Sequence, residues 1–183
     1  MQRRIQFVCV AVLCCLFFSA DGFAAPCGSI QSAQNSAILA NNTAAGGHVL
    51  KHITGAVNPP TSQKLATMFA DTGQYTNVWS GYTQYGAQID CADGSANGAK
   101  VSQQIAVSDL NLSTDDDTLQ VCQCGANVAN NVCQLGYYNV SSTITFVFKV
   151  VNSQWILLTA YPLNGAPTPN VCVGTAPAAS KKL

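Results

Sequence analysis

The clearest pattern of apolar positions lies late in the chain, in two runs on either side of Asn152-Ser153. The runs cover 143–151 and 154–161, and both are rich in β-branched and aromatic residues. Two such runs joined through two turn residues predict a β-hairpin. Because apolar residues occupy both faces of each run, we expect the hairpin to lie centrally in a sheet. The alternating segment 101–107 predicts a further strand, and 90–100 has the composition of a loop.

The first half of the chain has helical spacing instead. Residues 29–45 are small and polar with a weak helical period, and 48–53 predicts a short helix between glycines. A capped helix is expected over 61–69, and the aromatic residues of 75–85 recur at spacings of three and four, which predicts another helix. Helices precede strands, so the predicted fold class is α+β, with N-terminal short helices packed on an antiparallel sheet.

The two ends of the chain differ in composition from its middle. The first 24 residues hold two arginines, a short apolar run and then small residues, which is the order found in a secretory signal peptide. The apolar run is too short to cross a bilayer, so we expect a secreted protein, extracellular or periplasmic, without a membrane partner. The predicted organisation is a signal peptide (1–24), an N-terminal segment (25–45), one domain (46–163) and a Pro/Ala-rich tail (164–183) tethered by Cys172.

The cysteines agree with secretion. Beyond the predicted cleavage point the chain keeps Cys27, Cys91, Cys122, Cys124, Cys133 and Cys172. An even number in a secreted chain predicts three disulfides, whose pairing the spacing leaves open. Cys122 and Cys124 are expected to bond to different partners, because positions i and i+2 of one short segment do not bridge easily. A zinc site is the weaker alternative, since the spacing of these cysteines differs from the usual finger patterns.

Charge restricts the function further. Without the predicted signal peptide the chain has six lysines and seven aspartates, with neither arginine nor glutamate. This balance excludes a strongly basic nucleic-acid binder. A phosphate could still be held by a local cluster, for which Lys51, Lys64 and Lys149 are the candidates.

His48 and His52 are the two histidines of the chain, and both lie in one short segment. Their side chains have ordinary pKa values near neutrality, which makes them the candidate acid–base pair. Two alternatives stay open: ordinary polar helix positions, or a zinc pair that lacks both a third histidine and the glutamate of a zincin helix. We expect no metal and no cofactor. The Gly-x-Ser-x-Gly signature of a serine hydrolase is absent.

Two motifs resemble a known family. They are Gly46-Gly47-His48-Val-Leu-Lys51-His52-Ile-Thr-Gly55 and Trp155-Ile-Leu-Leu-Thr159-Ala-Tyr161-Pro162. Together they resemble the two ends of the bacterial ribonuclease A-like toxin domain, best known at the C-terminus of contact-dependent growth inhibition toxins. Thr67-Met-Phe69 is similar to the Ser/Thr-x-Phe segment that lies between those ends in the family.

This resemblance implies a ribonuclease A-like fold and metal-independent cleavage of RNA through attack of the 2′-OH. The disulfides predicted from the cysteine count would stabilise that fold. His48 and His52 would take the two histidine positions, and Thr159 and Tyr161 the closing hydroxyl pair. Lys64 or Lys51 would replace the arginine of the family. The implied partners are an RNA substrate and an immunity or inhibitor protein, and the implied role is that of a toxin or effector.

A non-catalytic secreted binding protein with the same fold is the alternative function. Its contact surface would be the aromatic stretch from Tyr75 to Tyr85, because tyrosine and tryptophan are favoured at interfaces. Geometry separates the two functions: a ribonuclease needs a histidine ring and the Tyr161 hydroxyl on one face.

Overall fold

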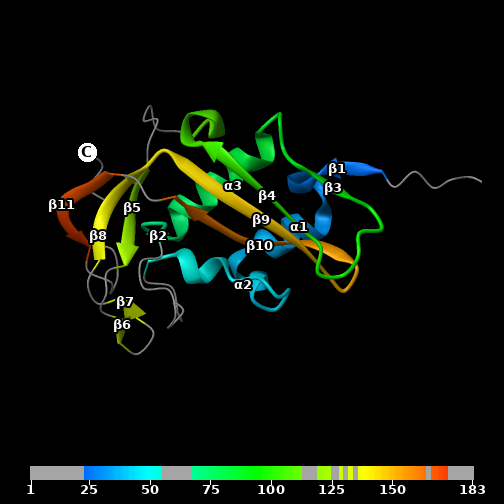
Figure 1. Ribbon diagram of the computed structural model, residues 1–183, viewed down its shortest axis with the longest axis horizontal. Helices are drawn as coiled ribbons and strands as arrows, with labels where there is room; N and C mark the ends of the chain where they lie inside the picture. Colours follow the sequence, from blue (N-terminus) through cyan, green and yellow to red (C-terminus); the bar gives the residue numbers. More distant parts are fainter. Residues whose placement is uncertain are drawn as a thin grey trace, which may run out of the picture.

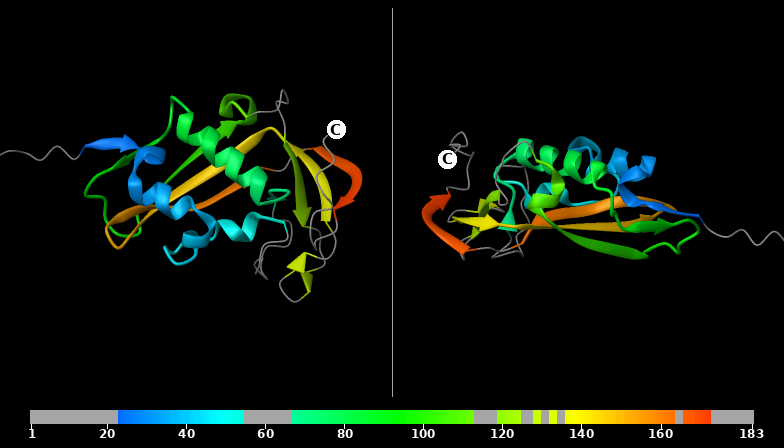
Figure 2. Two further views of the ribbon diagram at one scale, coloured as in Figure 1. Left: turned by 180° about the vertical axis from the view of Figure 1, so that it is seen from behind. Right: turned by 90° about the horizontal axis from the view of Figure 1, so that it is seen from above.

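The computed structural model describes residues 23–54, 67–112, 119–124, 128–129, 132–133, 136–163 and 166–172. Within them the protein is α+β with antiparallel sheets, as the sequence predicts. A three-stranded sheet runs along the middle of the molecule, and a four-stranded sheet lies at one end (Figure 1). Seen from the side in Figure 2, the helices gather on one face of the three-stranded sheet.

The helices are short and belong to the first two thirds of the chain. The α-helices are α1 (Gln31–Ala37), α2 (Leu39–Asn42) and α3 (Thr72–Gln84), and the 3-10 helices are η1 (Cys27–Ser29), η2 (Val49–His52) and η3 (Val107–Leu110). Asp71 caps the N-terminus of α3, and its carboxylate accepts a hydrogen bond from the Gln74 amide at 2.7 Å. The short helix predicted over 48–53 is present as the 3-10 helix η2. The helical prediction for 29–45 is confirmed by α1 and α2.

The strands of the longer sheets pair antiparallel throughout. The three-stranded sheet has the order β10-β9-β4, from β4 (Lys100–Ala106), β9 (Thr143–Val151) and β10 (Gln154–Pro162). The four-stranded sheet has the order β11-β8-β5-β2, from β2 (Thr67–Met68), β5 (Leu119–Cys124), β8 (Gly136–Ser141) and β11 (Ala166–Cys172). Two pairs complete the set: β1 (Ala24–Pro26) with β3 (Asp90–Ala92), and β6 (Val128–Ala129) with β7 (Val132–Cys133).

The predicted β9–β10 hairpin is confirmed, and its turn explains why two residues suffice. Asn152 and Ser153 both have positive φ, 49° and 61°. Two consecutive residues of this kind form the turn whose twist matches that of antiparallel strands. The hairpin is not central, however: β9 lies between two strands, whereas β10 is at the edge of its sheet.

Polar side chains from α1 and α2 cover this edge. Ser32 Oγ donates to the Trp155 carbonyl at 2.7 Å, and Asn42 Nδ2 donates to the Leu157 carbonyl at 2.9 Å. The Leu157 amide in turn donates to Ser36 Oγ at 2.8 Å. An exposed edge invites pairing with another chain, and these bonds satisfy it instead. The edge of β10 is therefore satisfied without a fourth strand. Side chains on both faces of β10 are also mostly buried, which is why its sequence resembles that of a central strand.

Helix α3 packs its aromatic side against the sheet. The Tyr82 ring stacks on Phe146 with centroids 4.1 Å apart, and Trp79 lies beside Phe146 and Phe148 at 6.4 Å. Tyr75 and Tyr82 are fully buried in the core. The helix predicted from these aromatic residues is confirmed. The expectation that they form a contact surface is wrong for Tyr75 and Tyr82, which the core contains, whereas Trp79 and Tyr85 are half-buried at its border.

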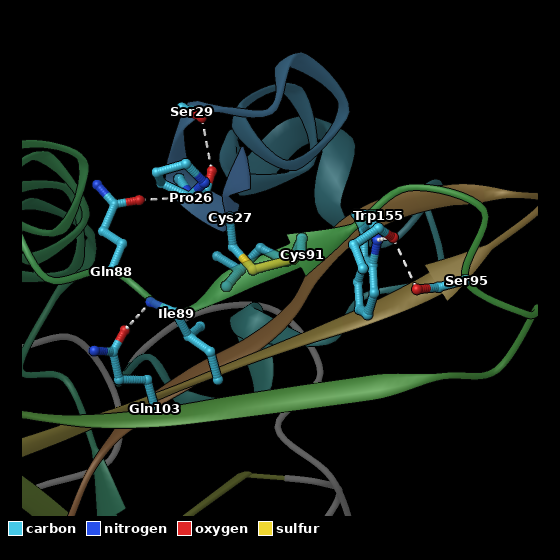
Figure 3. Close-up of a disulfide and its surroundings, with 12 residues drawn as sticks. Pro26, Cys27, Ser29, Gln88, Ile89, Cys91, Ser95, Gln103 and Trp155 are labelled. Carbon is cyan, nitrogen blue, oxygen red and sulfur yellow. Dashed lines mark hydrogen bonds between the residues drawn. A yellow bond between two sulfur atoms is a disulfide. The ribbon is translucent and has the colours of Figure 1, made fainter. Parts of the chain in front are cut away.

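One disulfide joins the start of the described chain to the middle. Cys27 of η1 bonds to Cys91 of β3, and both are fully buried (Figure 3). Next to it, the Ala92 carbonyl accepts hydrogen bonds from Trp155 Nε1 at 2.9 Å and Ser95 Oγ at 2.8 Å. The bridge thereby connects the segment predicted as a separate N-terminal part to the same core as the sheet. The side chains of the other four cysteines lie outside the described part.

Three sequence expectations need correction. The helix predicted over 61–69 ends as strand β2, where Thr67 and Met68 pair with Gln123 and Cys122 of β5, while 55–66 lies outside the described residues. The loop predicted over 90–100 begins with strand β3. Part of the predicted tail is strand β11, an edge strand, where prolines are tolerated because no neighbour needs their missing N–H.

Gly81 allows α3 to pack closely against η3. A Cβ atom at this position would run into the backbone carbonyl of Leu110 in η3, which cannot move like a flexible side chain. We expect Gly81→Ala to lower the free energy of unfolding by about 1–3 kcal/mol, although alanine is the better helix former. Urea denaturation measures the change. Gly86→Ala is the matched control, because a Cβ there meets nothing within 4 Å. Equal stability of the two variants would contradict the close approach.

A candidate acid–base site beside strand β10

The Gly46-Gly47-His48 motif is fixed against β10 by backbone contacts. The His48 amide donates to the Leu158 carbonyl at 2.8 Å, and the Gly47 amide donates to the Asn42 carbonyl at 2.8 Å. Gly46 has a φ of 94°, and a Cβ atom on it would lie 3.7–3.9 Å from Val151 and Ile156 side-chain atoms. The positive φ of Gly46 therefore favours glycine at this position, where the chain passes the end of the hairpin and brings His48 beside β10.

Asn42 holds the following turn. Its Oδ1 atom accepts from the Val49 amide at 2.8 Å, while its Nδ2 atom donates to the carbonyls of Ser36 and Leu157. This buried side chain thus connects α1, β10 and the start of η2. A Cβ on Gly47 would collide with it, which explains the second glycine of the motif.

The segment Thr67–Phe69 fixes the position of His52 through hydrogen bonds. The Phe69 amide donates to the His52 carbonyl at 2.8 Å, and the Thr54 amide donates back to the Phe69 carbonyl at 2.9 Å. His52 Nδ1 lies 3.4 Å from the Thr67 carbonyl. A carbonyl can only accept, so this contact favours the tautomer with the proton on Nδ1 and leaves Nε2 with its lone pair.

The two histidines and Tyr161 form one cluster of rings. The ring centroids of His48 and His52 are 6.0 Å apart, and those of His52 and Tyr161 are 5.1 Å apart with a nearly parallel stack of 29°. His52 is buried, whereas His48 and Tyr161 are half-buried. Of the predicted site residues, these three are brought into contact, and His48 is the more accessible of the two imidazoles.

Both histidines are held neutral near pH 7. Burial lowers the pKa of His48, and the positive charges of Lys51 and Lys100 lower it further. Burial lowers the pKa of His52 to about 4, against the small opposing effect of the Thr67 carbonyl, and His48 and Lys51 add to the lowering. Neutral imidazoles are proton acceptors, so the cluster supplies bases at physiological pH.

The register of the sheet shows which other side chains share the site's face. Tyr161 lies opposite Thr145, and Thr159 lies opposite Val147, on the face turned away from Phe146 and α3. Thr159 and Thr145 are buried, and neither Oγ1 atom has a hydrogen-bond partner among the described residues. Thr159 thus lies next to Tyr161, as the motif predicts, with an unused hydroxyl.

Lysines approach the same site. Lys51 follows His48 in η2 and is exposed, and Lys100 of β4 acts on His48 from across the sheet. Lys149 of β9 is half-buried directly opposite Lys100. Lys64, predicted as a site residue, lies outside the described residues.

Sequence reasoning missed Lys100. Its alternation with Ser102 and Gln104 could have indicated the exposed face of the strand. The pairing of Lys100 with Lys149, however, is a property of the register, which the sequence does not contain.

The lowered pKa of His52 predicts a pH-dependent stability. The folded chain binds this proton more weakly than the unfolded chain, whose histidine has a pKa of 6.5. The contribution of neutral His52 to the free energy of unfolding is therefore complete above pH 6.5. It falls by roughly 3 kcal/mol as the pH is lowered toward 4. Urea denaturation at pH 7, 5 and 4 measures it. The His52→Phe variant should lose less stability than the parent chain over this range; an equal loss would assign the effect to the carboxylates.

The arrangement combines two neutral imidazoles, a tyrosine hydroxyl and a local positive field. It can remove a proton from a hydroxyl group and stabilise negative charge nearby. No group of three His, Cys, Asp or Glu side chains that could hold a metal occurs within the described ranges.

The character of the helices and three comparisons with known proteins complete the description of the chain. None of the helices in the described residues is long and apolar enough to cross a membrane. The chain matches no protein-family model, and comparison with the curated proteins and with the solved structures gives no significant match.

Proposed function

We propose that the protein is a secreted, metal-independent endoribonuclease with a ribonuclease A-like fold. The single observation that carries the proposal is the ring cluster of His48, His52 and Tyr161, together with the positive field of Lys51 and Lys100 acting on His48. RNA carries its own nucleophile, the 2′-OH, so its cleavage requires proton transfer and charge stabilisation. The residues of this site supply both.

His48 acts as the base in this mechanism, because it is neutral and half-exposed. It takes the proton of the 2′-OH, the 2′-oxygen forms a bond to phosphorus, and the bond from phosphorus to the 5′-oxygen breaks. The products are a 2′,3′-cyclic phosphate and a free 5′-OH, which receives its proton from an imidazolium. A phosphate bound beside the rings stabilises protonated imidazoles, so that one histidine can give a proton while the other takes one.

The remaining side chains stabilise the phosphate. The Tyr161 hydroxyl and the unpartnered Thr159 hydroxyl can donate to its oxygens. Lys51 supplies positive charge at this phosphate, although a lysine acts as a point charge and not as the two-pronged donor that an arginine provides. This local field is what allows a chain with balanced overall charge to hold an anion.

The compartment and the biological role belong to the same proposal. The Cys27–Cys91 bridge is typical of proteins that fold under oxidising conditions, which agrees with secretion. The resemblance of the two end motifs to the toxin domain supports a role as a toxin or effector, with an immunity or inhibitor protein as its partner.

Cleavage of a fluorogenic RNA oligonucleotide by the oxidised mature protein in EDTA tests the function. We expect fragments that end in a 2′,3′-cyclic phosphate. A 2′-O-methyl strand of the same sequence should remain intact, because its nucleophile is blocked. Absence of cleavage by a folded protein, or equal cleavage of the blocked strand, would refute the proposed mechanism.

A further inference from the structure

Lys100 and Lys149 form an unusual pair on the face of the sheet that is turned away from α3. They lie directly opposite each other on the neighbouring strands β4 and β9. Side chains in such positions have Cβ atoms about 5 Å apart, and like charges there destabilise a sheet. Among the described residues, no carboxylate forms an ion pair with either lysine. The protein thus maintains two adjacent positive charges that nothing in the described residues neutralises.

The pair lies on the same face of the sheet as Tyr161, at positions on β4 and β9 that are offset from the ring cluster of His48, His52 and Tyr161. Lys149 is flanked along β9 by Val147, which faces Thr159, and across from it on β10 lies Ile156. The sheet order places β9 between β10, where His48 is attached, and β4, which carries Lys100. An anion at the two lysines would therefore lie one strand away from the imidazoles.

We propose that Lys100 and Lys149 form an anion subsite that binds a second phosphate of the RNA strand, next to the phosphate cleaved at His48. This inference rests on the proposed function for the identity of the strand. Two flexible ammonium groups on facing strands can reach one phosphate together, and the phosphate relieves their mutual repulsion. Since the extra contact needs a further nucleotide, the enzyme prefers strands of several nucleotides to dinucleotides.

Binding of an uncleavable strand tests the subsite without catalysis. A fluorescein-labelled 2′-O-methyl RNA octamer is titrated with the parent chain and with the Lys100→Gln/Lys149→Gln variant, between 50 and 200 mM salt, and anisotropy gives the affinity. Loss of two phosphate contacts should reduce the slope of log affinity against log salt by about 1.4. Over this range the affinity of the parent chain should fall about sevenfold more than that of the variant.

Two control variants separate the position of the two lysines from the net charge of the chain. Lys100→Arg/Lys149→Arg keeps both charges and should bind the octamer as the parent chain does. Lys181→Gln/Lys182→Gln removes the same charge from outside the described residues and should keep the parent slope. Thermal melting in buffer checks folding, and removal of the repulsion predicts an unchanged or higher melting temperature for the double glutamine variant.

The outcomes separate this proposal from the proposed function. A salt slope that is equal in the parent chain and the double glutamine variant would overturn the subsite, even if RNA cleavage is observed. Equal loss in the Lys181/Lys182 control would also overturn it, because net charge and not position would then govern binding. The expected slopes support the subsite whether or not the strand is cut, since cleavage is measured separately on unmodified RNA.

Discussion

Replacement of His48 by alanine is expected to lower the rate of RNA cleavage by about 10²–10⁴-fold, the contribution of a positioned general base. The side chain is half-buried and its backbone amide, not its ring, is bonded to β10, so the variant should fold normally. The rate of cleavage of the fluorogenic oligonucleotide at substrate concentrations below KM measures the loss. A variant that retains more than a tenth of the parent rate would exclude His48 as the base.

The pH profile of the same reaction distinguishes a base from a residue that merely supports the fold. A base must be unprotonated, and the pKa of His48 is lowered from 6.5 by burial and by Lys51 and Lys100. The acidic limb of kcat/KM should therefore lie below pH 6.5. Lys100→Gln removes one of these charges, so the limb should move toward higher pH in that variant. A limb that does not move would indicate that another group controls the rate.

The histidine cluster could be predicted only in part from the sequence. His48 and His52 were recognisable because their residue type is rare in this chain and has the right ordinary pKa. Their contact does not come from helical spacing, since η2 is a 3-10 helix and His48 precedes it. It depends on long-range bonds instead: His48 to β10, and His52 to the Thr67–Phe69 segment.

The fold, like the histidine cluster, could be predicted only in part from the sequence. The β9–β10 hairpin and α3 follow from local pattern and turn residues, and both were predictable. The edge position of β10 was not, because Ser32, Ser36 and Asn42 satisfy that edge from more than a hundred residues away in sequence. The sequence pattern predicts a helix where strand β2 lies, because the two residues of β2 carry no period of their own and take their conformation from β5.

Removal of the Cys27–Cys91 bridge is expected to lower the free energy of unfolding by about 4 kcal/mol, since the cysteines are separated by 64 positions. A Cys27→Ala/Cys91→Ala variant isolates this bridge, whereas a reducing agent would act on every disulfide of the chain. Urea denaturation gives the stability. Cys27→Ala alone should be no more stable than the double variant, because it also lacks the bridge and leaves a free thiol.

The effect should reach the site through α1. Helix η1, which carries Cys27, leads directly into α1, and α1 provides Ser32 and Ser36 for the edge of β10. Without the bridge these bonds lose their anchor, and the Leu157 amide should exchange its hydrogen faster. If stability falls but exchange at Leu157 does not change, the bridge constrains the chain without holding α1 on the sheet. Faster exchange together with slower RNA cleavage would show that the edge of β10, and the His48 loop attached to it, depends on a covalent bond at the start of the domain.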